Sequence, residues 1–136
     1  RVDQDPVTPG VQRVLLSSSP DTIVVDPRGS FVYVGLPDEQ ALAAFAVDAS
    51  TGRLLAIDAD ATAPGLQHFP LPGGGADRDR VSIEPSGRFL YAVVSQAGAP
   101  TILRYELDRA SGALTNLTTA ATPPVGFALL ATGRFE

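Results

Sequence analysis

The sequence predicts an all-β fold, and three observations indicate it. Twelve prolines and thirteen glycines in 136 residues divide the chain into short segments, which suit strands and turns better than long helices. The stretch from Leu103 to Leu107 alternates apolar and polar side chains with the period of two that marks a half-buried strand. A turn-and-strand motif occurs twice, in residues 26–35 and again in residues 84–93.

Each copy of this phrase opens with an acidic residue, a proline and a glycine at fixed spacing. The first copy reads Asp-Pro-Arg-Gly at residues 26–29, and the second reads Glu-Pro-Ser-Gly 58 positions later, at residues 84–87. Proline presets φ at the second corner, and the acidic side chain can accept backbone N–H bonds, so both are predicted to be type I turns. The strands that follow, residues 31–34 and 89–94, are apolar on both faces, as expected for strands between two layers.

Each copy then continues with the same sequence of elements. A second strand leads into a loop that begins with Asp and ends with Gly, and a short third strand follows the loop. The glycine supplies the positive φ that closes such loops. The segments are 42–47, 48–52 and 53–57 in the first copy, and 102–107, 108–112 and 113–117 in the second, where two extra residues near 97–100 raise the offset to 60.

Four-stranded antiparallel units that recur every 40–50 residues are typical of β-propeller blades. Residues 11–16 fit the last strand of a preceding unit, and Gly133-Arg134-Phe135 fits the opening of a following one. We therefore expect an all-β partial β-propeller with an incomplete ring of four-stranded antiparallel blades. Its expected parts are the end of a preceding blade (1–20), a blade (21–58), a long inter-blade loop (59–79), a second blade (80–118) and the start of a further blade (119–136).

An antiparallel sandwich with similar turns in its two halves is the alternative fold. In such a sandwich Tyr33 and Tyr91 would meet across one shared interior. In either fold we expect the aromatic side chains of the repeated strands to lie in the core: Phe31, Tyr33, Phe45, Phe89, Tyr91 and Tyr105.

Two blades cannot close a ring, so this arrangement requires additional blades. An open stack would expose apolar faces and strand edges. We expect the chain to be a piece of a longer polypeptide, with copies that complete one another's blades as the alternative. The predicted partners are accordingly further blades of the same parent chain or other copies of this one.

The two units resemble the lactonase-type seven-bladed β-propellers, the 6-phosphogluconolactonase-like family. The resemblance is carried by DPRGSFVYVG…AFAVDASTGRL and EPSGRFLYAV…LRYELDRASGAL, and it covers roughly residues 21–58 and 80–136. It implies a ring that binds a sugar lactone at its central opening through charged side chains from several blades. That set of side chains has no numbered equivalents here, because only turn and core positions match. The third turn, residues 131–133, also lacks the acidic-Pro pair.

Composition excludes several classes of function. A net charge of −5 without a basic stripe argues against nucleic-acid binding. No stretch approaches the run of about 18 apolar residues that a membrane helix needs, so membrane insertion is not expected. The absence of cysteine removes thiolate catalysis and thiolate metal sites, and no cofactor is expected.

The link between the two units, residues 58–80, is where candidate chemistry gathers. It holds the single histidine, His68, which could act as a general base or position a lactone carbonyl. The alternative is a surface-loop histidine beside Phe69. Alternating charges follow, and their arginines could clamp an anionic sugar, although such runs are commonly solvated loops. These residues are Asp77, Arg78, Asp79 and Arg80.

Two Asp-x-Asp pairs in the same link, Asp58 with Asp60 and Asp77 with Asp79, could gather round calcium. No EF-hand spacing is present, so no metal site is predicted. Gly73-Gly74-Gly75 lacks the lysine of a P-loop, and no Gly-x-Ser-x-Gly elbow is present. The sequence therefore favours a non-catalytic module that presents loops to a protein or sugar ligand. The alternative is part of a lactone hydrolase acting on sugar lactones.

Overall fold

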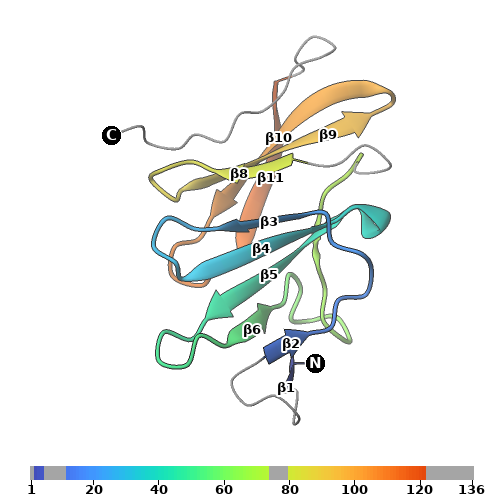
Figure 1. Cartoon of the computed structure of the whole chain (residues 1–136). Helices are drawn as coiled ribbons and strands as arrows, with labels where there is room; N and C mark the ends of the chain where they lie inside the picture. Colours follow the sequence, from blue (N-terminus) through green and yellow to red (C-terminus); the bar gives the residue numbers. More distant parts are fainter. Residues whose placement is uncertain (1, 5–11, 74–79, 122–136) are drawn as a thin grey trace.

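The computed structural model describes residues 2–4, 12–73 and 80–121, and these residues are all-β apart from one 3₁₀ turn (Figure 1). The predicted all-β fold is confirmed. The described residues form no helix with the length and hydrophobicity that a membrane crossing requires. The elements are β1 (Val2–Gln4), β2 (Gln12–Val14), β3 (Thr22–Val25), β4 (Phe31–Leu36), η1 (Pro37–Glu39), β5 (Ala41–Val47), β6 (Leu54–Ile57), β7 (Phe69–Pro70), β8 (Arg80–Ile83), β9 (Phe89–Gln96), β10 (Ala99–Leu107) and β11 (Leu114–Ala121).

Two sheets account for most of these strands. The first sheet has the order β3-β4-β5-β6, with β7 paired to the beginning of β5, and the second has the order β8-β9-β10-β11. All of their strand pairs are antiparallel. Strands β1 and β2 pair with each other as a separate hairpin. Sheets of this kind are compatible with the expected partial propeller.

The predicted turns form, and they close with equivalent hydrogen bonds in the two sheets. The Gly29 N–H donates to the Asp26 carbonyl at 2.9 Å, and the Gly87 N–H donates to the Glu84 carbonyl at 2.9 Å. The Asp26 carboxylate also accepts the N–H groups of residues 28, 30 and 31, at 3.1, 2.6 and 2.7 Å. This satisfies backbone donors that the tight turn would otherwise leave unpaired.

The Asp-to-Gly loops are equally alike. Gly52 donates its N–H to the Asp48 carbonyl at 2.6 Å, and Gly112 donates to the Asp108 carbonyl at 2.7 Å. Both glycines have the positive φ that the sequence predicts, +70° and +75°. The carboxylate of Asp48 caps its loop by accepting bonds from the N–H and hydroxyl of Ser50.

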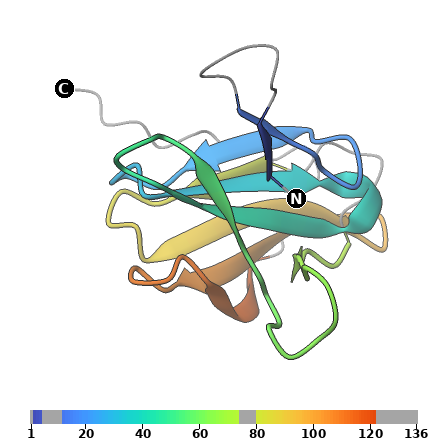
Figure 2. The same cartoon turned by 90° about the horizontal axis from the view of Figure 1, so that it is seen from below.

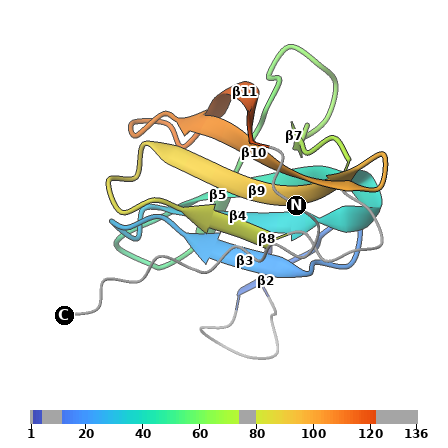
Figure 3. The same ribbon diagram turned by 90° about the horizontal axis from the view of Figure 1, so that it is seen from above.

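The two sheets stack face to face, with their strands running in similar directions (Figure 3). Strands β3 and β8 lie beside one another where the sheets approach closely. One apolar cluster fills the space between the sheets. From the first sheet it takes Phe31, Tyr33, Leu42 and Ala44, which we call the Tyr33 face, and from the second it takes Leu90, Ala92, Val94, Leu103, Tyr105 and Leu107, the Leu90 face.

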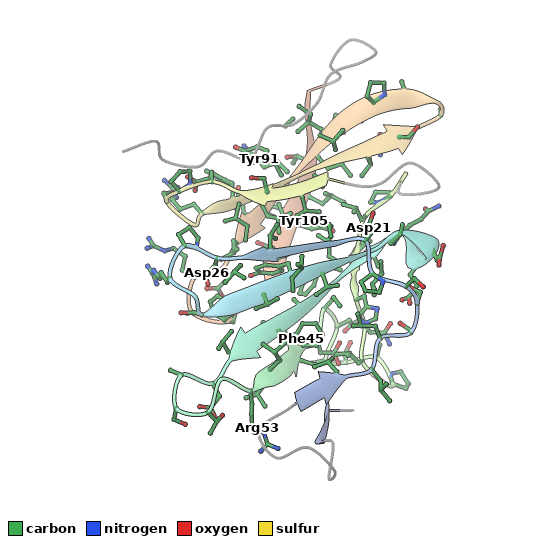
Figure 4. The ribbon with its side chains drawn as sticks, in the orientation of Figure 1. Asp21, Asp26, Phe45, Arg53, Tyr91 and Tyr105 are labelled. Carbon is green, nitrogen blue, oxygen red and sulfur yellow. The ribbon has the colours of Figure 1, made fainter. Side chains whose placement is uncertain are left out.

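The stacking is directional, because the two sheets do not contribute equivalent faces to it. Positions 58 residues apart are equivalent, so the counterpart of Tyr33 is Tyr91. Tyr91 and Phe89 alternate with the buried Leu90 and lie on the far side of β9, away from the first sheet (Figure 4). Tyr33 and Tyr91 therefore do not share an interior, which argues against the sandwich alternative.

The burial predictions for aromatic residues are partly wrong for the same reason. Tyr33, Phe45 and Tyr105 are buried, as is Phe31. Phe89 and Tyr91 are only half-buried, because no second layer among the described residues covers their side of the sheet. They share this Tyr91 face of the second sheet with Arg104 and Glu106.

A second, smaller cluster covers the other side of the first sheet, which we call the Val32 face. It is formed by Val32, Val34, Leu36, Ala43 and Phe45. Val14 and Leu16 pack against part of this face, and the β1–β2 hairpin lies on the same side of the sheet (Figure 2). Among the described residues, the first sheet is thus the middle layer, whereas the second sheet is covered on one side only.

The link expected to be a long loop (59–79) contributes to the fold. Its residues 69–70 form β7, which pairs with residues 41 and 42 of β5. Phe69 and Leu71 are buried in the cluster between the sheets. Leu71 donates its N–H to the Gln40 carbonyl at 2.6 Å, and the Tyr105 hydroxyl donates to the Pro70 carbonyl. Predicted segments beyond residue 121 lie outside the described residues.

Candidate functional site

Among the residues predicted to act in catalysis or in sugar binding, His68 is the one whose side chain the structure describes. It immediately precedes β7, and Phe69, the next residue, points into the core. Because neighbouring residues of an extended segment face opposite sides, His68 lies on the Val32 side of the first sheet. Its Nδ1 atom lies 2.9 Å from Oε2 of Glu39, in the 3₁₀ turn η1.

Glu39 is prepared to act as the acceptor of this pair. The hydroxyl of Ser17 donates a hydrogen bond to the Glu39 carboxylate, and this bond is the main cause of a lowered Glu39 pKa. Burial acts in the opposite direction but is the weaker effect, and the hydrogen bond with His68 lowers the pKa further. The carboxylate is therefore ionised at neutral pH. A histidine that donates Nδ1–H to a carboxylate has Nε2 available as a hydrogen-bond or proton acceptor. The pair is the arrangement that a general base requires.

A cleft of about 320 Å³ adjoins His68. Its walls are apolar except at Ser17 and His68, so a polar group that enters it meets few competing partners. Sequence analysis missed Glu39 and Ser17, which lie 29 and 51 positions from His68 and follow no spacing rule. The apolar lining residues are Val14, Leu15, Leu16, Phe45, Ala56 and Leu66.

The predicted anionic clamp stays a prediction. Asp77, Arg78 and Asp79 lie outside the described residues. The backbone of Arg80 is placed opposite Val93 in the second sheet, but its side chain is not described.

Asp58 and Asp60, the two candidate calcium ligands that the structure describes, accept hydrogen bonds within their own loop. Oδ1 of Asp58 accepts the N–H groups of Asp60 and Gln67, at 3.0 and 2.9 Å, and so closes the base of loop 58–67. Asp60 accepts the N–H and hydroxyl of Thr62, and these bonds lower its pKa. Among the described residues, no group of three or more His, Asp or Glu side chains could hold a metal ion.

A larger groove, of about 460 Å³, lies on the Val32 face beside β3. Its lining is mostly apolar, with Asp21 at one end. Asp21 and Phe45, two lining residues, are labelled in Figure 4. The remaining residues of the lining are Val14, Leu16, Pro20, Thr22, Ile23, Val34 and Leu54.

The Tyr91 face of the second sheet is polar by comparison. Two guanidinium groups, those of Arg88 and Arg104, lie 5.3 and 5.1 Å from the centre of the Phe89 ring, which is cation–π distance. Arg104 also lies 3.8 Å from the Glu106 carboxylate, so these two side chains form a partly exposed ion pair.

Comparisons with known proteins support the fold. No protein-family model and no curated protein sequence matches the chain. A crystal structure of a candidate 6-phosphogluconolactonase from Bacteroides uniformis matches 95% of this chain and 37% of its own, with a TM-score of 0.60 and 19% identity. A second candidate 6-phosphogluconolactonase, from Bacteroides fragilis, matches 87% of this chain and 31% of its own, with a TM-score of 0.60 and 21% identity. This chain spans about a third of the length of either structure. The lactonase-like relation predicted from the sequence is thus supported at the level of the fold.

Proposed function

We propose that the chain is a section of a propeller-type hydrolase that opens a sugar lactone. The likeness of nearly the whole chain to two proteins described as candidate 6-phosphogluconolactonases carries this proposal. It supports the lactone-hydrolase alternative better than the non-catalytic module that the sequence favoured. The proposal includes a sugar lactone as the substrate, with or without a phosphate group, and a propeller ring that is completed by residues outside this chain.

The His68–Glu39 pair is the candidate catalytic base. Water would attack the lactone carbonyl carbon while its proton passes to Nε2 of His68. The bond from the carbonyl carbon to the ring oxygen would then break, and the leaving oxygen would take that proton. Glu39 would orient the imidazole and stabilise its charged form through the 2.9 Å contact with Nδ1.

An assay of acid release from gluconolactone and from its 6-phosphate tests this proposal. The full chain should hydrolyse one of them faster than buffer does. His68→Ala should lower that rate by about a hundredfold, in the range of general-base removal. Glu39→Gln should lower it less, and Asp38→Asn, a matched change on the neighbouring exposed residue of η1, should leave it unchanged. A folded chain that does no better than buffer would refute a lactone-opening site made by these residues alone, and a fully active His68→Ala variant would refute the role of His68.

A non-catalytic binding module remains the second candidate, and two observations favour it. The same His68–Glu39 contact joins the 58–73 link to η1, so it also serves to fix the fold. The described residues place no cationic side chain against the cleft that could stabilise an oxyanion. Binding of intact sugars or sugar acids without turnover would support this second function.

A further inference from the structure

A polar cavity lies at the joint of the two sheets, at the end that carries the acidic-Pro-x-Gly turns. Its volume is about 250 Å³, and both turns contribute to its wall. Asp26, one of the lining residues, is labelled in Figure 4. Strand β4 begins at this end and leads to η1, so the cavity lies at the opposite end of the first sheet from the His68–Glu39 contact.

The two cationic residues of the lining, Arg28 and Arg109, stand where the two copies of the repeat differ. Arg28 is the third residue of the first turn, and its equivalent in the second turn is Ser86. Arg109 follows the aspartate of the second Asp-to-Gly loop, where the first loop has Ala49. The equivalent turns and loops close with the same hydrogen bonds, so closure requires neither arginine. Variable side chains on a rigid loop frame are where binding sites are commonly built.

The joint holds the backbones of both arginines in place. A Cβ atom at Gly87 would lie 3.5 Å from Cδ of Pro27, so the two turns are in van der Waals contact. The Tyr33 hydroxyl donates to the Gly112 carbonyl at 2.8 Å, in the loop that carries Arg109. The cavity is therefore formed by the stacking of the two sheets, and neither sheet provides it alone.

The carboxylates at this end accept hydrogen bonds within their own turns and loops. Asp26 accepts three backbone N–H groups of its turn, and Glu84 accepts two of its own. Asp108 accepts one N–H and one hydroxyl of its loop. Among the residues that the structure describes, no carboxylate is paired with the guanidinium of Arg28 or Arg109. Both guanidinium groups thus retain hydrogen-bond donors for an external anion.

We propose that this cavity binds a dianionic phosphate group, either free or as the monoester of a small molecule. Each guanidinium would offer two parallel N–H donors to phosphate oxygens in charge-assisted hydrogen bonds. One such fork satisfies both oxygens of a carboxylate, so two forks suit the additional oxygens and the greater charge of a phosphate. Phe31 and Leu107 also line the cavity, and apolar walls strengthen electrostatic contacts by lowering the local dielectric constant.

This site is separate from the proposed lactonase site. The six residues of β4 span roughly 20 Å at the rise of a strand, and they lie between the two sites. A sugar whose lactone carbonyl is held at His68 cannot extend its own phosphate that far. The phosphate is therefore a second ligand, and because it contacts both sheets its binding should stabilise their joint.

NMR titration of the ¹⁵N-labelled full chain with inorganic phosphate tests the proposal. Chloride keeps the ionic strength constant, and a pH of about 8 keeps phosphate mostly dianionic. Arg28→Gln and Arg109→Gln each remove one guanidinium. Arg53→Gln is the matched control, because this arginine directly follows the first Asp-to-Gly loop but does not line the cavity. Glycerol 3-phosphate and acetate serve as further probes.

Amide shifts of residues 26–31, 85–88 and 108–112 should change saturably with phosphate, and Arg53→Gln should bind it as well as the unmodified chain. Each cavity variant should raise the Kd about tenfold or more, as expected for the loss of charge-assisted hydrogen bonds. Tighter binding of glycerol 3-phosphate would identify a monoester as the ligand, and weaker binding would identify free phosphate.

Three results would overturn the proposal. They are shift changes that do not saturate, a Kd that is the same in both cavity variants as in the unmodified chain, and acetate binding as tight as phosphate binding. Because the titration measures binding and not turnover, it gives its answer whether or not the chain hydrolyses a lactone.

Discussion

The hydroxyl of Tyr33 and the carbonyl oxygen of Gly112 join the two sheets at 2.8 Å, across 79 residues of sequence. Tyr33 is fully buried, and burial is the main reason that its pKa is raised far above the ordinary value. The hydrogen bond ties a central strand of one sheet to a loop of the next. It therefore reports on how the two units stack.

Tyr33→Phe should lower the free energy of unfolding by about 1–3 kcal/mol, because the Gly112 carbonyl would remain buried without its donor. Tyr91→Phe is the matched control at the equivalent position on the open Tyr91 face, and should cost less than about 0.5 kcal/mol. Urea unfolding of both variants measures the difference. Equal costs would contradict the directional stacking.

Alanine substitutions at the equivalent glycines Gly52 and Gly112 should also lower the free energy of unfolding by different amounts, with the larger loss at Gly112. Both positions have positive φ, so each variant loses about 1–2 kcal/mol through backbone strain. Gly112→Ala should lose a further 1–3 kcal/mol, roughly the cost of overpacking, because its Cβ would meet Phe31 and Ile57. Thermal or urea unfolding gives both values, and a Gly52→Ala variant that is the less stable of the two would count against the fold.

Phe69→Ala should destabilise the protein by about 3–5 kcal/mol, the usual cost of removing a buried phenylalanine. The neighbouring His68→Ala change, on the opposite side of β7, should cost much less because it removes only a partly exposed contact. Urea unfolding distinguishes the two. A small loss at Phe69 would mean that the link does not pack between the sheets.

Stability should fall at acidic pH, partly through the Asp-to-Gly loops. Hydrogen bonds from Ser50 and Thr51 lower the pKa of Asp48 to about 2, and bonds from Ala110 and Ser111 lower that of Asp108. A carboxylate whose folded pKa lies below its unfolded value of about 3.9 stabilises the fold above that value. For Asp48 this contribution is lost as the pH falls from about 4 through about 2.

The Asp48→Asn variant should therefore show a shallower acid-induced loss of stability than the unmodified chain over this interval. Asp38→Asn, an exposed change outside the loop, serves as the control. Unfolding midpoints measured between pH 2 and pH 6 would provide the test, and identical profiles for Asp48→Asn and the unmodified chain would contradict it.

Local patterns in the sequence were sufficient to predict the repeated turns and the central strands β4, β5, β9 and β10. The acidic-Pro-x-Gly corners and the Asp-to-Gly loops depend on nearby backbone geometry, so residues such as Asp26 and Gly112 could be assigned directly. The half-burial of Tyr91 could not be predicted, because its counterpart Tyr33 has the same local sequence and differs only in its neighbouring layer. Strand β7 was also missed, since two residues give no periodic pattern.

The candidate site was predicted only in part. His68 stood out as the single histidine in an unusually long link. Its partner Glu39 comes from a 3₁₀ turn of the first sheet, and only the path of residues 58–68 back across that sheet brings the two together. Such a contact depends on tertiary structure and leaves no spacing in the sequence.

Thiol labelling of two single-cysteine variants tests the central claim most directly, since the chain has no cysteine of its own. Ile23→Cys and Val81→Cys occupy equivalent positions, 67% and 9% exposed in the unmodified chain. In the native state the first should react with a thiol reagent at least about tenfold faster than the second, which must wait for local opening. Equal native-state rates at the two positions would contradict the directional stacking of the sheets.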